Sequence, residues 1–347
     1  MIPRWLNQKD GSISLNDIIR YTKGGFSGPG VPVGQTTPVI IIPAAASSSV
    51  PTAAPSVVIE AGADEVAELF SSMGVHGNPQ NSVALDTQLR MSVQITDVAY
   101  RRRLMNQPIL VDHIFGTNLQ PFFFRESTLL ESQQTMLFDF NNNSTAGPTY
   151  YQFALEKRKF QATALTRKDV TEYIGEMRRR KMFLSPFWLT SDSPIVVNPG
   201  AQADVFFTVT NDIYGILFGN ICSVIAALGS TGDTEEFFTV EIFDAKTERP
   251  LQNQPIARSC CSGGNLIAQP AAIMGVQGTA GFPFPLSTGW IVEPNTKIHM
   301  RFTSLITNNP ISIFMTLVGV SAYCNKNPLQ YPEVDVSVNS DASVGAP

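Results

Sequence analysis

The sequence predicts an all-β protein: two tandem jelly-roll-like antiparallel β-sandwiches from an internal duplication, joined by one helix, with an extended N-terminal arm. Three observations indicate this: a stretch that occurs twice, short runs of strand-forming residues between turn residues, and a proline-rich N-terminal segment. The predicted parts are the arm 1–56, the first sandwich 57–161, the helical linker 162–186, the second sandwich 187–323 and the C-terminal tail 324–347.

The N-terminal segment has too few apolar residues to form a domain. Leu15, Ile18 and Ile19 share one face of a short predicted helix that two glycines end. The Pro, Gly, Ala and Ser that follow are typical of an extended chain. We expect this arm to lie away from its own sandwiches and to add a strand to the sheet edge of another subunit. The residues expected in that strand are Val39, Ile40, Ile41 and Ile42.

The clearest repeat places residues 93–109 on residues 240–256, a shift of 147, with nine identical positions. An aspartate in such a stretch can bind the backbone of its own turn, and a proline marks where strand pairing begins. We interpret each copy as a strand, a turn and the start of the next strand. The repeated residues with a structural role in this interpretation are Asp97, Asn106 and Pro108, and their equivalents Asp244, Asn253 and Pro255.

A second block aligns residues 121–138 with residues 285–302 at a shift of 164. The larger shift predicts an insertion in the second copy, within residues 259–282, whose length is the difference between the two shifts. The Gly, Ala and Gln of this segment are typical of an exposed loop or extra hairpin, which the fold can lose at little cost. Residues 65–75 fit a helix or a strand equally well by period.

The linker contains the best helix pattern of the chain, residues 166–184. Thr166 can cap its first turn, and basic residues lie at its end, where cations are favoured. Its apolar stripe consists of Val170, Tyr173, Ile174 and Met177. We expect this helix to connect two copies of one fold.

Composition and motifs argue against several functions. A net charge of −5 gives no electrostatic basis for nucleic-acid binding. No secretory signal is visible, and the apolar run near the start is too short to cross a membrane. The four cysteines and three histidines show no metal-binding spacing, and no nucleotide-binding or hydrolase motif occurs. We therefore expect no enzymatic activity, cofactor, metal, small-molecule substrate, nucleic-acid partner or membrane partner.

The second copy resembles β-sandwich structural proteins of bacteriophage virions in stretches between residues 187 and 319. The first group of matching residues is Ile242, Asp244, Thr247, Arg249, Leu251, Asn253, Pro255 and Ile256. The second group is Pro294, Ile298, Phe302, Thr303, Leu305, Leu317 and Gly319. The resemblance implies a capsid, neck/collar or tail-attached role. The first copy departs from it, since Glu156 follows Leu155 where the second copy has Val318 and Gly319.

The leading hypothesis is a non-enzymatic virion protein, assembled in the host cytoplasm, whose arm and sandwich edges bind copies of itself and other virion proteins. Within it, a neck/collar or head-decorating component is favoured because the long arm suits an anchored accessory protein. A double-jelly-roll major capsid protein, forming pseudo-hexagonal trimers, is the alternative. A carbohydrate- or receptor-binding sandwich is an alternative of another class, which exposed, clustered Trp and Tyr side chains would support.

Overall fold

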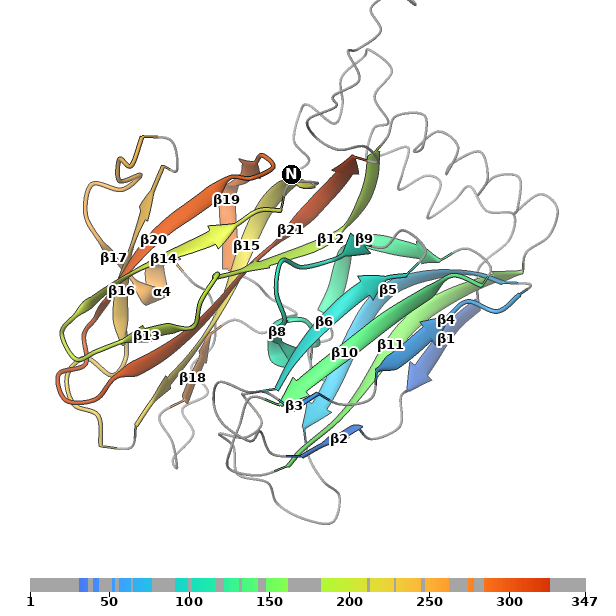
Figure 1. Cartoon of the computed structure of the whole chain (residues 1–347), viewed down its shortest axis with the longest axis horizontal. Coiled ribbons are helices and arrows are strands. Elements are labelled where there is room, and N and C mark those ends of the chain that lie inside the picture. The colour runs from blue at the N-terminus through green and yellow to red at the C-terminus, as the bar shows by residue number, and fades with distance from the viewer. Residues whose placement is uncertain are drawn as a thin grey trace, which may run out of the picture.

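The protein consists of two β-sandwiches that lie side by side (Figure 1). The computed structural model describes residues 31–36, 40–43, 52–53, 56–63, 65–76, 91–98, 102–116, 122–130, 133–142, 148–161, 182–210, 213–227, 229–244, 247–261, 274–277 and 284–324. All statements below concern these residues.

The first sandwich has two sheets and one short 3-10 helix. One sheet consists of β1 (Val31–Thr36), β2 (Ile40–Ile42), β5 (Glu65–His76), β9 (Phe122–Leu130) and β11 (Thr149–Gln161). The other consists of β3 (Thr52–Ala53), β4 (Val57–Glu60), β6 (Met91–Asp97), β7 (Arg102–Arg103), β8 (Ile109–Leu110) and β10 (Thr135–Asn142). The helix η2 (Val111–His113) follows β8 directly.

The second sandwich has the same plan. One sheet consists of β12 (Met182–Thr190), β13 (Ile195–Val197), β15 (Ile213–Ala226), β18 (Met274–Gln277), β19 (Phe284–Val292) and β21 (Ile311–Cys324). The other consists of β14 (Gln202–Thr208), β16 (Phe238–Phe243), β17 (Ile256–Ala257) and β20 (Lys297–Ser304). The short helix α4 (Arg258–Cys261) follows β17 as η2 follows β8.

The strand order identifies both sandwiches as jelly rolls. Some strand positions are broken into two pieces, namely β1 with β2, β3 with β4, β7 with β8, β12 with β13 and β18 with β19. Counted this way, each sandwich has eight positions, with one sheet ordered first–eighth–third–sixth and the other second–seventh–fourth–fifth. Two four-position sheets connected in this order form a jelly roll. The predicted fold class of two tandem jelly rolls is therefore confirmed.

Part of the expected arm belongs to the first jelly roll. β1 and β2 pair with β11, and β3 pairs with β10. Ile40 and Ile42 are buried in the first core, because alternate residues of a strand point to the same face. The expectation that residues 31–56 lie away from their own sandwich is thus wrong for the strands they form. Residues 1–30, including Leu15, Ile18 and Ile19, and Val39 lie outside the described residues.

The predicted linker is shorter than expected at its C-terminal end. Residues 182–186 belong to β12, which pairs with β21 of the second sandwich. Phe183 and Leu184, the last two residues of the predicted helix, instead lie in the first strand of the second jelly roll. Residues 162–181, which carry most of the predicted helix, lie outside the described residues.

The repeated stretch occupies the same place in both jelly rolls. β6 and β16 are the fourth strands, β8 and β17 are parts of the fifth strands, and the shift of 147 aligns the starts of both pairs. For the second block the shift of 164 is wrong. A shift of 162 aligns β9 with β19 and β10 with β20, first residue and last, and also aligns the starts of β11 and β21. The insertion in the second copy is accordingly shorter than predicted, by the difference between these two shifts.

Both jelly rolls also share a β-bulge in the third strand. The pairing of β5 with β9 shifts between Leu69 and Ser71, and that of β15 with β21 shifts between Leu217 and Gly219. Each bulge contains one phenylalanine, Phe70 or Phe218. Bulges are reproducible features of related folds. Their coincidence indicates that the two copies match in detail as well as in strand order.

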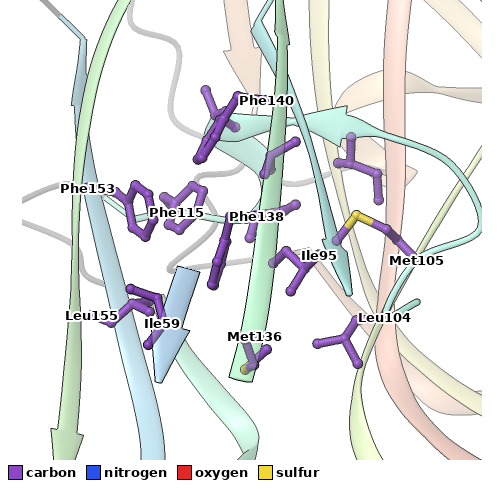
Figure 2. Close-up of a cluster of buried hydrophobic side chains, with 14 of the residues drawn as sticks. Ile59, Ile95, Leu104, Met105, Phe115, Met136, Phe138, Phe140, Phe153 and Leu155 are labelled. Atoms are coloured by element: carbon purple, nitrogen blue, oxygen red, sulfur yellow. The ribbon is translucent and has the colours of Figure 1, made fainter. Parts of the chain in front are cut away.

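Each sandwich encloses its own apolar core. In β10 every second residue is buried, so Met136, Phe138 and Phe140 point inward. Figure 2 shows these side chains beside Phe115 and Phe153. The rings of Phe115 and Phe153 lie 4.8 Å apart between centroids, within the range of favourable aromatic pairs.

The insertion contributes to the second sandwich. β18, within residues 259–282, pairs with Cys222–Ile225 of β15, next to the place where β19 pairs with the same strand. Part of the segment predicted to be a loop or extra hairpin is therefore a strand of the sheet. Residues 262–273 and 278–283 lie outside the described residues.

Candidate functional site

The contact between the two jelly rolls is the most elaborate polar and apolar constellation among the described residues. Residues 104–113 of the first sandwich meet β12 and the outer face of the β12–β21–β15 sheet of the second. We call this contact the seam. In Figure 1, β12 and β21 run along the side of the second sandwich that faces the first.

Backbone pairing and one asparagine hold the edge of the seam. The Trp188 amide donates to the Leu104 carbonyl at 3.2 Å, and Met105 and Trp188 form a parallel β-bridge. The Asn106 side-chain amide donates to the Thr190 carbonyl at 2.9 Å, and its oxygen accepts from the Thr190 amide at 3.0 Å. The Asn106 side chain therefore pairs with the Thr190 backbone as a strand residue would, and it extends the pairing beyond the backbone bridge.

A buried histidine connects the first sandwich to the sheet face of the second. His113 Nδ1 lies 2.8 Å from the Thr316 hydroxyl oxygen, and Nε2 lies 2.8 Å from the Ser223 hydroxyl oxygen. Hydroxyls both donate and accept, so these two can serve either tautomer of a neutral imidazole. Burial lowers the pKa of His113 from 6.5 to about 4, although the Asp112 carboxylate acts in the opposite direction. The imidazole is therefore neutral at pH 7.

The seam also has an apolar part. Trp188, Ile221 and Val318 belong to the second sandwich by sequence, but they pack into the hydrophobic core of the first. Trp188 is fully buried. Removal of apolar area from water stabilises such a contact. Separating the two jelly rolls would therefore expose part of a core.

Removing the asparagine of the seam should weaken the contact. We expect Asn106→Ala to lower the free energy of unfolding by about 2 kcal/mol, because two hydrogen bonds that span the seam are lost. The repeat supplies a matched control, Asn253→Ala, in which the equivalent asparagine is exposed. Urea denaturation of both variants measures the difference. Equal losses in the two would contradict a special role for Asn106.

Acid should weaken the seam through His113. Its pKa is depressed in the folded protein, so the unfolded chain binds a proton below pH 6.5 that the folded chain takes up only near pH 4. Stability should therefore fall as the pH drops from 6.5 to about 4, by up to about 3 kcal/mol, and level off below. His113→Gln should remove this part of the pH dependence. Urea denaturation of both proteins between pH 7 and pH 4 tests this, and parallel curves would contradict it.

A second constellation lies on the outer face of the second sandwich. Phe206, His299 and Phe243 occupy directly paired positions on β14, β20 and β16, and their rings are stacked at centroid distances of 4.8 and 4.5 Å. His299 Nδ1 lies 2.8 Å from Glu248 Oε2, and Nε2 lies 3.0 Å from Asp204 Oδ1. Sequence reasoning missed this group because its members come from separate strands and one turn.

The hydrogen bonds around His299 have a structural role. The Arg301 Nε donates to Asp204 at 2.8 Å. Burial raises the pKa of the Asp204 carboxyl, but hydrogen bonds from His299 and Arg301 and the Arg301 charge outweigh it, so the pKa lies below its ordinary value. Among the described residues, no serine, threonine or cysteine is bonded to His299 as a nucleophile would be. The cluster therefore ties the turn that carries Glu248 to the sheet.

The described segments offer no metal site, since no group of three or more His, Cys, Asp or Glu side chains in them could hold a metal ion. In the same segments, no helix has both the length and the apolar character needed to cross a membrane.

The repeated residues have different surroundings in the two copies. Asp244 accepts a hydrogen bond from the Thr247 hydroxyl in its own turn at 2.6 Å, whereas buried Asp97 accepts one from the Gln134 side chain at 3.1 Å. Pro108 and Pro255 directly precede β8 and β17. Of the residues predicted for assembly, Ile40 and Ile42 are core residues and Ile41 is exposed.

Comparisons with known proteins give weak structural likenesses. No protein-family model matches the chain, and no curated protein matches its sequence. A structure of Sulfolobus Turreted Icosahedral Virus aligns with 85% of this chain and 91% of its own, at 11% identity and a TM-score of 0.37. PBCV-1 VP54, fitted into a reconstruction of the virophage Sputnik, aligns over 87% and 97%, at 9% identity and a TM-score of 0.37.

The major capsid protein P2 of bacteriophage PM2 aligns with 84% of this chain and 98% of its own, at 10% identity and a TM-score of 0.28. At these TM-scores the likenesses carry no argument about fold or role. The assignment of two jelly rolls rests on the strand order and pairing of this chain.

Proposed function

We propose that the chain is a non-enzymatic structural subunit of a virion, in which its two jelly rolls act as one rigid building block. The observation that supports this is the seam. Two complete jelly rolls are joined by buried side chains, backbone pairing and the His113 hydrogen bonds in addition to the chain that connects them. A fixed angle between two similar blocks is what a regular shell requires of its subunit, because each copy must present the same edges to its neighbours.

Within this proposal a shell-forming capsid protein is favoured over a neck/collar or head-decorating component. The preference for a collar depended on an arm, residues 1–56, that leaves its own domains. β1, β2 and β3 instead complete the sheets of the first jelly roll. The natural setting of this role is a virion, of a bacteriophage or another virus, assembled in the host cytoplasm from copies of this chain and other virion proteins.

A carbohydrate-binding sandwich has less support. Such modules present aromatic side chains to a sugar, but Trp188 is buried in the seam and Trp290 packs against the second core.

The low content of charged residues, 15%, also suits a virion subunit whose surface is largely covered by neighbours.

Assembly of the purified full-length chain tests the proposal. Electron microscopy and mass photometry should show closed shells or sheets built from one repeating oligomer. A single ring of fixed copy number, without further growth, would support the neck/collar component instead. A protein that stays monomeric at high concentration, and that glycan arrays identify as a sugar binder, would overturn the structural role.

A further inference from the structure

A histidine on the outer face of the second jelly roll lies between two carboxylates and between two aromatic rings. We call His299, Asp204, Glu248, Phe206 and Phe243 the His299 cluster. Nδ1 of the histidine lies 2.8 Å from Glu248 Oε2, and Nε2 lies 3.0 Å from Asp204 Oδ1. The rings of Phe206 and Phe243 are stacked on the imidazole at interplanar angles of 25° and 19°. The imidazole therefore cannot turn away from the carboxylates without disturbing a ring stack.

The two short contacts of His299 require two protons on the imidazole. An ionised carboxylate can only accept a hydrogen bond, and a neutral imidazole has a single N–H to donate. Burial acts to raise the pKa of the Asp204 carboxyl, but hydrogen bonds from His299 and Arg301 hold it below its ordinary value, so Asp204 is ionised and accepts from Nε2. Without a second proton, the Nδ1 lone pair would face Glu248 Oε2 at 2.8 Å with no hydrogen between them. The observed arrangement is thus that of an imidazolium.

The charged groups around His299 come from three strands and one turn. Among the described residues they are Asp204 of β14, Glu241 of β16, Glu248 of the turn, and Arg301 and Lys297 of β20. Arg301 is itself paired, since its Nε donates to Asp204 at 2.8 Å and its Nη1 lies 3.7 Å from Glu241 Oε2. Three anions against two cations, together with the negative faces of two aromatic rings, favour a protonated imidazole.

The contact with His299 holds a strained turn against the sheet. Glu248 has a φ of 52°, in the left-handed region that residues other than glycine rarely adopt. Within the turn its amide donates to the Asp244 carbonyl at 2.8 Å, and the Thr247 hydroxyl donates to the Asp244 carboxylate. The Glu248 side chain is 60% exposed, so its carboxylate reaches water once the contact opens. The contact with His299 therefore offsets the strain of the turn and fixes its position.

The first jelly roll has the same sheet without this cluster. At the shift of 162, Leu137 of β10 stands at the position of His299. Leu137 is paired with Val58 of β4 and Thr96 of β6, as His299 is paired with the two phenylalanines. None of these three residues has a titratable side chain. The strand pairing of a jelly roll therefore does not need the histidine, and the cluster adds a property to the second copy.

We propose that the His299 cluster is a pH-sensitive switch, which holds the Glu248 turn against the sheet at acidic pH and releases it at higher pH. Histidine side chains lose a proton between about pH 5 and pH 8. The remaining N–H stays with Asp204, which is ionised and fixed on β14, so Glu248 loses its hydrogen bond. Because the contact needs the protonated form, its stabilisation is present at low pH and is lost as the pH rises. This goes beyond the proposed function, since it holds whether or not the chain forms a shell.

Hydrogen exchange of the full-length chain tests the switch. Mass spectrometry follows the backbone amides of residues 244–251 at about pH 5.5 and about pH 8, either side of most of the histidine range, with the intrinsic pH dependence of exchange corrected. Protection should be about three- to tenfold lower at the higher pH, the factor for losing a partly exposed hydrogen bond between charged groups. Residues 97–104, the equivalent stretch of the first copy, are the internal reference and should keep their protection. Equal protection of residues 244–251 at both pH values would overturn the proposal.

Two variants identify the groups of the switch. The side-chain amide of Glu248→Gln can accept from an imidazolium and donate to a neutral imidazole, so residues 244–251 should stay equally protected at both pH values. His299→Gln has no titratable group at this position and should give low protection at both, with circular dichroism as the check that it is folded. A pH-dependent loss in Glu248→Gln as large as in the parent would overturn the switch, even if His299→Gln did not fold. A loss at the lower pH instead, the direction expected from His113, would also overturn it.

Discussion

Trp188→Ala is expected to lower the free energy of unfolding by about 3 to 5 kcal/mol, the range for removing a large aromatic side chain from a core. Trp188 is fully buried and belongs to the core of the first jelly roll, although its strand pairs within the second. The cavity should therefore weaken the first core and the seam together. Chemical denaturation should show the lower free energy of unfolding. Calorimetry should show the two jelly rolls unfolding in two separate transitions.

An exposed residue of the same sheet supplies the control for Trp188→Ala. Ile291 on β19 is 56% exposed, so Ile291→Ala should change stability by less than about 0.5 kcal/mol. If Trp188→Ala cost less than about 1 kcal/mol, well below the range for a buried aromatic side chain, the seam would contribute little to the fold. The argument that the two jelly rolls form one rigid unit would then fail.

Gly319→Ala is expected to destabilise the second jelly roll by about 3 kcal/mol or more, at the upper end for overpacking. A Cβ at this position would lie 2.2 Å from the Ile216 carbonyl oxygen and 3.1 Å from the Leu217 Cα. These are backbone atoms of the neighbouring strand at the bulge, so relief requires β15 and β21 to separate. The melting temperature and the free energy of unfolding should both fall.

Gly215→Ala is the matched control in the same sheet. Its Cβ would approach the Val292 Cγ2 at 3.0 Å and a Phe187 ring carbon at 3.5 Å, and both are side-chain atoms that can shift. We expect a loss of about 1 kcal/mol or less. Similar losses in the two glycine variants would show that the close backbone approach at Gly319 is not the cause.

Much of the fold was predictable because strand patterns and turn residues are local signals. The repeat located the fourth and fifth strands of both jelly rolls, since its identities include core residues such as Val93 and Val240. The first strand was misassigned for a physical reason. Ile40–Ile42 pairs with Thr149–Tyr151, in the last strand of the same jelly roll, and its flanking Pro, Ala and Ser resemble a free arm. The ambiguous residues 65–75 became a strand because β11 pairs with them.

The seam could not be found from the sequence. Residues 104–109 and 251–256 read almost alike, yet one copy is covered and the other is exposed. The difference arises because the second sandwich packs against the first copy of this stretch. A local sequence pattern carries no information about that contact. His113 was visible as a lone histidine, but its partners lie 110 and 203 residues away along the chain. Similarly, the His299 cluster exists only once three strands are side by side.

The position of Trp188 has a consequence for the order of events on the ribosome. The first jelly roll has all its strands once Gln161 has left the exit tunnel, but the indole that completes its core belongs to β12, synthesised later. Until then the nascent domain exposes apolar side chains that Trp188 will cover, such as Met105. Domains generally fold as units during synthesis, and exposed apolar surface favours aggregation. The first jelly roll can therefore complete its core only after the first strand of the second has been synthesised.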